Sequence, residues 1–516
     1  MRNLILDCSV VIEACRNPDS NALLFETLNS ARKADVDIWI YTAEASSILQ
    51  SLSSTNPLGE TSGNQKENNP KSLFKAFVCD CQWLATLADD LSDLDCADLV
   101  QAALLKASAR LGDDTKILTF SQDRLKAGLP FITLTELVSL PPEKQISFID
   151  LRRQQSKIRG SLESRIHQVL HHGRYVFGSE IEDLELQLAN YVGVSHCVCV
   201  SSGTDALLAS LMAIEIQPGD EVITSPFSFF ATAEVMSLLG AVPMYVDIEP
   251  TSFNIDATKI EAAITPRTRA IVPVSLYGQC ADMDVINEIA IRHDLIVIED
   301  AAQSFGATYK GKRSGSLSNL ACTSFFPAKP LGAYGDGGAC FTDDPGLAEL
   351  LRQVRDHGQD SRYHHVRIGI NGRMDTLQAA VLLSKIPIFE DEINRRQLVA
   401  SRYLEGLLYL QRQGGLVLPE VRGSRTSSWA QYTIRLSDRE AVRAAMAQQG
   451  IPTTVHYPTT LYSQPALRDR SIDCPESESA AESVLSLPMH PYLEKEAQGQ
   501  IIKSLAGILG SDGSDC

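Results

Sequence analysis

The chain has 516 residues, of which 44% are hydrophobic and 21% charged, and its formal net charge is −18. This length exceeds one ordinary hydrophobic core, so we expect at least two domains, and the composition is that of a folded protein and not of a disordered one. An acidic chain of this size repels nucleic-acid phosphates, which argues against non-specific binding of DNA or RNA.

The 12 cysteines show no spacing typical of a zinc site or of a redox pair. We interpret them as free thiols of a reducing compartment. The N-terminal stretch contains Asp7 and Glu13 and is too polar for a signal peptide. No apolar run reaches the roughly 18 residues that span a bilayer. The sequence therefore predicts a soluble, cytoplasmic protein without membrane contact.

Residues 1–140 predict a small α/β domain of alternating strands and helices. Its β-rich runs occupy residues 3–7, 37–41 and 116–120. Residues 54–72 are rich in turn formers and lack apolar periodicity, which predicts a flexible loop. Residues 141–145 (PPEKQ) predict a linker to the next domain.

A second unit begins near residue 146 and alternates short apolar runs with helical patterns. The apolar runs occupy residues 196–200, 221–224, 243–247, 270–275 and 295–300. Such alternation predicts a mostly parallel sheet covered on both faces, with ligands at the carboxyl ends of its strands. Longer helical stretches follow, so we predict a large domain at 146–390 and a smaller C-terminal domain at 391–510.

Small residues follow the run at 196–200, where Ser202, Gly203 and Thr204 open an apparent helix. Small residues between a strand and a helix leave backbone N–H groups free, which favours a phosphate. Many tight strand-to-helix turns share this pattern, so phosphate binding and a purely structural turn are both open.

The run at 295–300 ends in Glu299 and Asp300. A carboxylate at the end of a buried strand can pair with a protonated pyridine nitrogen, as the electron-withdrawing ring of pyridoxal 5'-phosphate (PLP) requires. A helix-capping or solvated aspartate is the alternative.

Lys329 lies among apolar and small residues, shortly before the glycine-rich stretch at 335–338. Partial desolvation lowers a lysine pKa and makes the amine a nucleophile, as a Schiff-base lysine requires. A lone lysine is more often a surface residue. The order of phosphate turn, strand-end carboxylate and lysine favours PLP.

In combination, the motifs SSGTDAL, IEDAAQSFGA, TSFFPAKPLGAYGDGG and INGRMDTLQAA resemble those of the DegT-type sugar aminotransferases, which have fold type I of the PLP-dependent transferases. The resemblance runs from about residue 148 to residue 508. The stretches VSLYGQCADMD, DHGQDSRYHHVRIG, TTVHYP and LPMHPYL most resemble enzymes that aminate UDP-2-acetamido-2-deoxy-3-oxo-D-glucuronate. The resemblance implies transamination of a UDP-linked keto-sugar by glutamate, for cell-surface polysaccharide, lipopolysaccharide or O-antigen synthesis.

The resemblance also implies the cofactor contacts. Lys329 forms the Schiff base with PLP, Asp300 pairs with the pyridine nitrogen, and Gln303 bonds the ring hydroxyl. Gly203, Thr204 and Ser324 hold the phosphate, and Phe229 stacks on the ring. Some family members carry histidine in place of the lysine and act as dehydratases, so Lys329 favours transamination.

Further matching residues imply a partner subunit and substrate contacts. Asn371 would reach the phosphate of the neighbouring subunit's cofactor, so the site implies a homodimer. Arg373, His456 and Tyr457 resemble residues that meet the sugar. A surface arginine, a buried histidine and a core tyrosine would explain these three as well.

Residues 1–140 lie outside this resemblance and resemble a PIN-like domain, whose members are often metal-dependent ribonucleases. The residues that carry this second resemblance are Asp7, Glu44, Asp98 (or Asp95) and Asp123. Clustered carboxylates can hold Mg²⁺ or Mn²⁺ and activate water for RNA cleavage. Carboxylates on solvated faces, in a degenerate domain used for docking or regulation, are the alternative.

Three hypotheses for the whole chain follow. The first is a PLP-dependent aminotransferase. The second is a PIN-type ribonuclease whose aminotransferase-like half only dimerises it. The third is a PLP-binding sensor without turnover.

Overall fold

The computed structural model describes residues 146–469 and 471–511, together with the short strands 3–6, 37–40, 115–118 and 131–132 of the N-terminal segment. The chain divides into two compact units, Met1–Lys144 and Gln145–Cys516.

The described part of the first unit is a parallel sheet in the order β2-β1-β3-β4. Its strands are β1 (Asn3–Leu6), β2 (Asp37–Ile40), β3 (Thr115–Leu118) and β4 (Phe131–Ile132). The first three overlap the predicted β-rich runs at 3–7, 37–41 and 116–120, whereas β4 is too short for a pattern to show. The predicted loop and the carboxylates Asp7, Glu44, Asp95, Asp98 and Asp123 lie outside the described residues.

The second unit is built on a 7-stranded sheet in the order β5-β13-β12-β9-β8-β6-β7. Its strands are β5 (His196–Val200), β6 (Glu221–Thr224), β7 (Val242–Tyr245), β8 (Thr268–Val272), β9 (Ile296–Asp300), β12 (Leu320–Ser324) and β13 (Gly338–Thr342). Strand β13 runs antiparallel to both its neighbours, and the other neighbouring strands pair in parallel. The predicted mostly parallel sheet is confirmed.

Some predicted strands differ from the observed ones in their bounds, and two observed strands were not predicted. The runs at 243–247 and 295–300 correspond to β7 (Val242–Tyr245) and β9 (Ile296–Asp300). The run at 270–275 ends early as a strand, because Pro273 follows β8 and has no N–H for the ladder. Strands β12 and β13 were not predicted, since their sequences LACTS and GACFT are poor in the β-branched residues that mark strands.

Helices connect these strands and form most of the C-terminal segment. They are α9 (Leu151–His172), α10 (Ser179–Val192), α11 (Gly203–Ala213), α12 (Ala231–Leu238), α13 (Ala257–Ile260), α14 (Met283–Arg292), α15 (Pro345–Arg355), α16 (Thr376–Arg412), α17 (Arg439–Gln448), α18 (Pro475–Ser483) and α19 (Lys495–Ser511). Short strand pairs complete the fold: β10 (Thr308–Tyr309) with β11 (Lys312–Arg313), β14 (Gln359–Ser361) with β15 (His364–His365), and β16 (Tyr432–Arg435) with β17 (Val484–Leu487).

Both faces of the central sheet are buried against helices. Successive side chains of a strand point to opposite faces of the sheet, so neighbouring residues of one strand belong to different cores. On β5, Cys197 and Cys199 belong to the core that contains residues of α10 and α16. Val198 and Val200 belong to the opposite core, with residues of α11 and α15. The helices therefore leave the strand ends as the place where polar side chains can gather.

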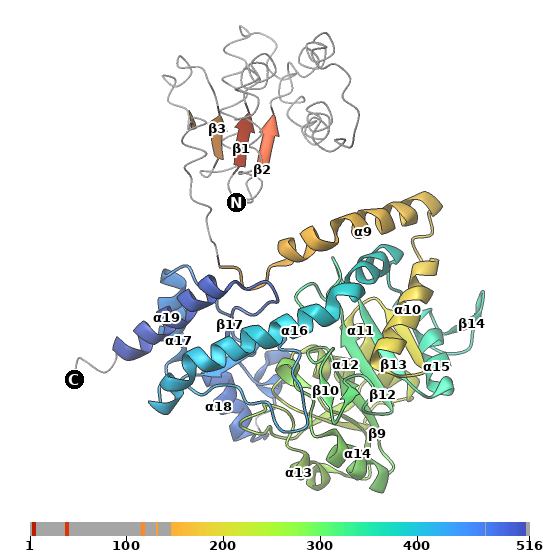
Figure 1. The fold of residues 1–516 in the computed structure, drawn as a ribbon. Helices are drawn as coiled ribbons and strands as arrows, with labels where there is room; N and C mark the ends of the chain where they lie inside the picture. The colour runs from red at the N-terminus through yellow and green to blue at the C-terminus, as the bar shows by residue number, and fades with distance from the viewer. Residues whose placement is uncertain are drawn as a thin grey trace, which may run out of the picture. The chain divides into compact units, whose positions relative to one another are not determined.

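Helix α16 joins two hydrophobic cores. Leu382 and Leu383 lie in the core on one face of the sheet, whereas Val399, Tyr403 and Leu407 lie in a second core with β16, β17 and α19. Figure 1 shows α16 running from the sheet to the segment that holds α17 and α19. Residue 390, at which the sequence divides the two predicted domains, lies inside this single helix. In the part of the chain that the structure describes, no helix is both long and apolar enough to cross a bilayer.

Candidate active site

Six of the seven strands run parallel, so their carboxyl ends lie at the same edge of the sheet. The carboxyl ends of β5, β9 and β12 lead directly into Ser201, Ala301 and Phe325. Because parallel strands place their carboxyl ends together, the predicted residues on these three connections share one site. Strands β6 and β8 end beside them and supply the segments that follow Thr224 and Val272.

The turn between β5 and α11 is pressed against β12. Ser202 caps α11, and its hydroxyl accepts a 3.0 Å hydrogen bond from the Asp205 N–H. A Cβ added to Gly203 would lie 2.6 Å from Ser324 Cβ, so only glycine allows this approach. The first N–H groups of a helix have no partner within the helix and attract anions. The turn and Ser324 thus form a cradle that fits a phosphate.

Asp300, the last residue of β9, is 5% exposed. Its carboxylate accepts 3.0 Å and 3.1 Å hydrogen bonds from the Thr232 hydroxyl and the Ala302 N–H. Burial raises the pKa of Asp300, and the hydrogen bonds and the positive charge of Lys329 offset only part of this effect. A buried carboxyl in this state gains from a cation, so the position fits a protonated pyridine nitrogen.

Lys329 is half-buried on the loop that follows β12. Burial lowers the pKa of Lys329, and the negative charge of Asp300 opposes the shift. Mutual electrostatic effects of this kind require that the two groups be close. The amine is therefore neutral more often than that of a surface lysine, as a nucleophile or base requires.

Gln303 and Tyr457 extend the site beyond Asp300. The Gln303 amide N–H donates to the Tyr457 hydroxyl at 3.0 Å, and its oxygen accepts from the Tyr277 N–H at 3.0 Å. The Phe229 ring is 56% exposed, and its centroid lies 6.2 Å from that of Tyr457. Burial raises the pKa of Tyr457, and the negative charge of Asp300 adds to the shift, so the Tyr457 ring lies near the Asp300 carboxylate with Phe229 beside it.

His456 lies next to Tyr457, and its Nδ1 is 3.0 Å from the Ser486 hydroxyl. Burial lowers the pKa of His456 to about 4, and the charge of Lys329 adds to the effect. The imidazole is therefore neutral near pH 7 and can exchange hydrogen bonds without carrying charge.

Residues 371–373 lie beside the phosphate turn of the same chain. The Gly372 carbonyl accepts a 2.8 Å hydrogen bond from the Ser201 N–H. Asn371 is exposed, and the Arg373 guanidinium pairs with Asp356 at 3.2 Å. The structure thus brings this segment to the edge of the site and leaves the Asn371 side chain accessible.

Sequence reasoning did not find Thr232, which binds the Asp300 carboxylate, or Tyr277, whose N–H fixes Gln303. Thr232 lies in the first turn of α12, three residues after Phe229, and the sequence assigned it no role. Among the described residues, no group of three or more His, Cys, Asp or Glu side chains could hold a metal ion.

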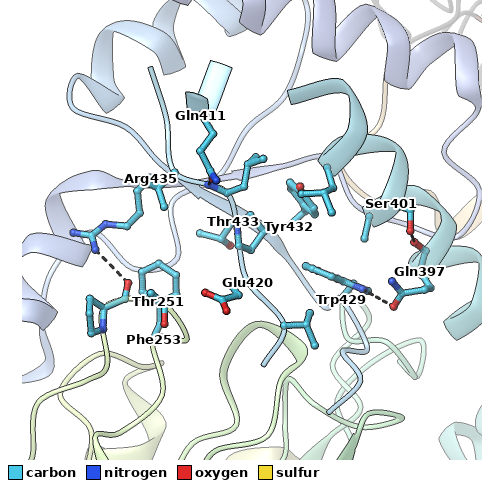
Figure 2. A pocket seen from close by; sticks show the side chains of 17 residues that line it. Thr251, Phe253, Gln397, Ser401, Gln411, Glu420, Trp429, Tyr432, Thr433 and Arg435 are labelled. Atoms are coloured by element: carbon cyan, nitrogen blue, oxygen red, sulfur yellow. Dashed lines mark hydrogen bonds between the residues drawn. The ribbon is translucent and has the colours of Figure 1, made fainter. Parts of the chain in front are cut away.

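A hollow of about 510 Å³ lies elsewhere, between α16, β16 and the segment at 250–253 (Figure 2). Trp429 donates to Gln397 at 2.9 Å on its wall, and Arg435 donates to the Pro250 carbonyl at 3.3 Å. Its lining contains none of the predicted site residues. The strand-end site, where charged groups perturb one another, is the better candidate for chemistry.

Comparison with known proteins identifies the family to which the chain belongs. The sequence profile of the DegT/DnrJ/EryC1/StrS aminotransferase family matches residues 156–506. The UDP-2-acetamido-2-deoxy-3-oxo-D-glucuronate aminotransferase of Pseudomonas aeruginosa is 55% identical over 349 residues, which are 68% of this chain and 96% of that protein.

Two solved structures are also similar. A DegT DnrJ EryC1 StrS aminotransferase from Brucella abortus is 43% identical with a TM-score of 0.68, over 70% of this chain and 99% of that one. NtdA from Bacillus subtilis with the bound cofactor PMP, the aminated form of PLP, is 32% identical with a TM-score of 0.66, over 80% of this chain and 97% of that one. The chain belongs to the DegT/DnrJ/EryC1/StrS family and is a PLP-dependent sugar aminotransferase.

Proposed function

We propose that the protein transfers the amino group of glutamate to the 3-oxo carbon of UDP-2-acetamido-2-deoxy-3-oxo-D-glucuronate or a close analogue, with PLP held on Lys329. The products would be 2-oxoglutarate and the UDP-linked 3-amino sugar. One observation carries the proposal: Lys329 and Asp300 perturb each other's pKa at the strand edge that also holds the Gly203–Ser324 cradle. The relative from P. aeruginosa supports the choice of sugar.

The residues of the site would divide the work between binding and proton transfer. PLP supplies an electron-withdrawing ring that stabilises negative charge on the carbon that loses its proton. Gly203, Thr204 and Ser324 would bind the phosphate. Asp300 would keep the ring nitrogen protonated, while Gln303 bonds the ring hydroxyl and Phe229 covers one face of the ring.

Lys329 would act twice. Its amine binds the cofactor at rest and, once released, removes the Cα proton of glutamate as a general base. The same amine would return a proton to C3 of the sugar in the second half of the reaction. The lowered pKa of Lys329 supports both roles, because a neutral amine is the reactive form.

Arg373, His456 and Tyr457 would meet the sugar. Arg373 already pairs with Asp356 and is partly exposed, so it can also face a uronate carboxylate. Comparing this substrate with its analogue that lacks the carboxylate tests the pairing. Arg373→Ala is expected to weaken turnover of the uronate about tenfold or more and to leave the neutral sugar nearly unchanged.

We also infer a homodimer in which Asn371 serves the site of the partner subunit. The exposed Asn371 side chain supports this inference. Lys329→Ala and Asn371→Ala variants should each be inactive alone. Mixed after unfolding and refolding together, they should regain about a quarter of the wild-type activity, because half of the dimers carry one intact site. No recovery would place Asn371 in the site of its own chain.

The decisive experiment is incubation of the purified protein with PLP, glutamate and a panel of UDP-linked 3-oxo sugars, followed by mass spectrometry for an amine. The absorbance band of lysine-bound PLP should appear in the wild type, fade on addition of glutamate and be absent in Lys329→Ala. A band that glutamate does not change would indicate a sensor without turnover. If glutamate removes the PLP absorbance band but no sugar of the panel is aminated, the proposed sugar substrate is wrong.

For residues 1–140 we propose a PIN-like domain, because the sequence resembles one at Asp7, Glu44, Asp98 and Asp123. Its carboxylates would hold Mg²⁺ or Mn²⁺ if it cleaves RNA. Mn²⁺-dependent cleavage of single-stranded RNA that Asp7→Asn abolishes would establish a nuclease. Unchanged RNA would leave docking or regulation as the role.

A further inference from the structure

The loop that carries Lys329 closes on itself. At its neck, the Ala333 N–H donates to the Phe325 carbonyl at 2.7 Å, and inside it the Lys329 N–H donates to the Phe326 carbonyl at 2.8 Å. A Cβ added to Gly332 would lie 2.5 Å from the Pro327 carbonyl oxygen. The two arms of the loop are therefore in direct backbone contact, and a shift of Gly332 must move the segment that presents Lys329.

A lysine from another element holds this loop. Lys385 of α16 is 0% exposed, and its Nζ donates to the Gly332 carbonyl at 2.5 Å. The same Nζ lies 4.1 Å from the centroid of the Tyr334 ring. Lys385 thus contacts the loop at two residues, on the arm opposite Phe326 and Pro327.

Burying the amine of Lys385 at this position costs folding free energy. Burial lowers the pKa of Lys385 to about 7, and Glu392, one of the titratable groups near it, only partly opposes the effect. Glu392 is itself bound by Gln154 of α9 and by the Tyr492 hydroxyl. Tyr334 is a second titratable neighbour, and its hydroxyl makes no hydrogen bond to another described residue. An apolar residue would avoid this cost but would leave the Gly332 carbonyl without its donor.

We propose that Lys385 is a positioning residue for the aminotransferase reaction, which holds the Gly332 carbonyl and thereby fixes the loop that presents Lys329 to the cofactor. The inference rests on the proposed role of Lys329. It assigns to Lys385 no contact with substrate or cofactor.

Lys385→Met tests the proposal, because methionine fills similar space without a donor. Arg396→Met is a matched control: Arg396 lies on the same helix, is 4% exposed and donates to the carbonyls of Trp429 at 2.9 Å and Met489 at 3.3 Å, outside the Lys329 loop. Three quantities should be measured for each variant: the Kd of PLP, the pH midpoint of the lysine-bound PLP absorbance band, and kcat against KM.

We expect Lys385→Met to raise the Kd of PLP about tenfold, to move the pH midpoint by about half a unit or more, and to lower kcat while KM changes little. Arg396→Met should lose stability but keep the wild-type Kd and midpoint. Lys385→Arg, which retains a donor of similar reach, should restore the midpoint.

If Lys385→Met does not fold, Lys385→Gln replaces it, since its shorter amide cannot span the same distance. A wild-type Kd and midpoint in whichever of the two folds would overturn the proposal. The same is true if Arg396→Met shifts both quantities equally, because the effect would then be one of general stability. Absence of the band in the wild-type protein would instead refute PLP binding at Lys329 itself.

Discussion

Gly203→Ala is the most direct test of the phosphate cradle. The new Cβ would lie 2.6 Å from Ser324 Cβ and 3.0 Å from Ser324 Oγ. Non-bonded carbons normally sit about 3.5–4.0 Å apart. The first turn of α11 or the end of β12 must therefore move by roughly 1 Å, and overpacking of this kind costs about 1–3 kcal/mol.

The cost should appear mainly as weaker cofactor binding, because both displaced groups belong to the cradle. Since about 1.4 kcal/mol corresponds to a tenfold change, the Kd of PLP is expected to rise about tenfold or more. Titration of the apoprotein with PLP, followed by absorbance, measures this Kd. Urea unfolding of the apoprotein separates the loss of stability from the loss of binding.

Gly160→Ala is the matched control, because no atom other than the neighbouring backbone of its own helix lies within 4 Å of the added Cβ. Gly160 lies within α9, where alanine should stabilise the helix by about 0.5–1 kcal/mol and leave PLP binding unchanged. A wild-type Kd for Gly203→Ala would show that the approach of Gly203 to Ser324 does not shape the phosphate site.

Three further results are expected. Asp300→Asn keeps the shape of the side chain but removes its charge, so kcat should fall roughly 100-fold or more while PLP stays bound. Single-turnover assays with glutamate measure this loss. A smaller loss would contradict the pairing of Asp300 with the ring nitrogen. Tyr457→Phe removes the 3.0 Å bond from Gln303, so kcat/KM should fall about five- to tenfold with an unchanged PLP spectrum; a loss of the cofactor would show that Tyr457 acts on PLP instead. Burial lowers the pKa of His490 to about 4, so the unfolded chain binds more protons between about pH 6.5 and 4, and stability falls as the pH drops through that range by up to about 3 kcal/mol. Urea unfolding of apo His490→Gln should show a smaller loss from pH 7 to 4.5 than the wild type.

Much of the fold could be predicted because burial leaves a simple pattern. Strands β5 and β6 coincide with their apolar runs, since both are covered on both faces. Strands β12 and β13 were not predicted because they consist largely of small residues, and a run such as LACTS has no pattern that separates it from a loop. Their place in the sheet is set by the neighbours with which they pair, which no local pattern records.

The candidate site was predicted in part for a related reason. Asp300 and Lys329 lie in motifs that local spacing can mark, and the structure brings them together. Thr232 and Lys385 carry no such mark, because each acts on a residue distant in sequence. Only the packing of α12 and α16 against the strand ends shows what they bind.

Because β13 runs antiparallel to β12, the length of the connection between these two strands constrains the position of Lys329. Because β12 and β13 form a hairpin, the chain returns from the Lys329 loop straight into the sheet, with Ser324 paired to Gly338 at its base. Gly338 in turn abuts the Ser202 backbone, where an added Cβ would lie 2.3 Å from the carbonyl oxygen. The positions of Lys329, Ser324 and Ser202 therefore all depend on the pairing of β12 with β13. We expect that inserting or deleting one residue between 325 and 337 would displace Lys329 while the other strands of the sheet keep their pairing.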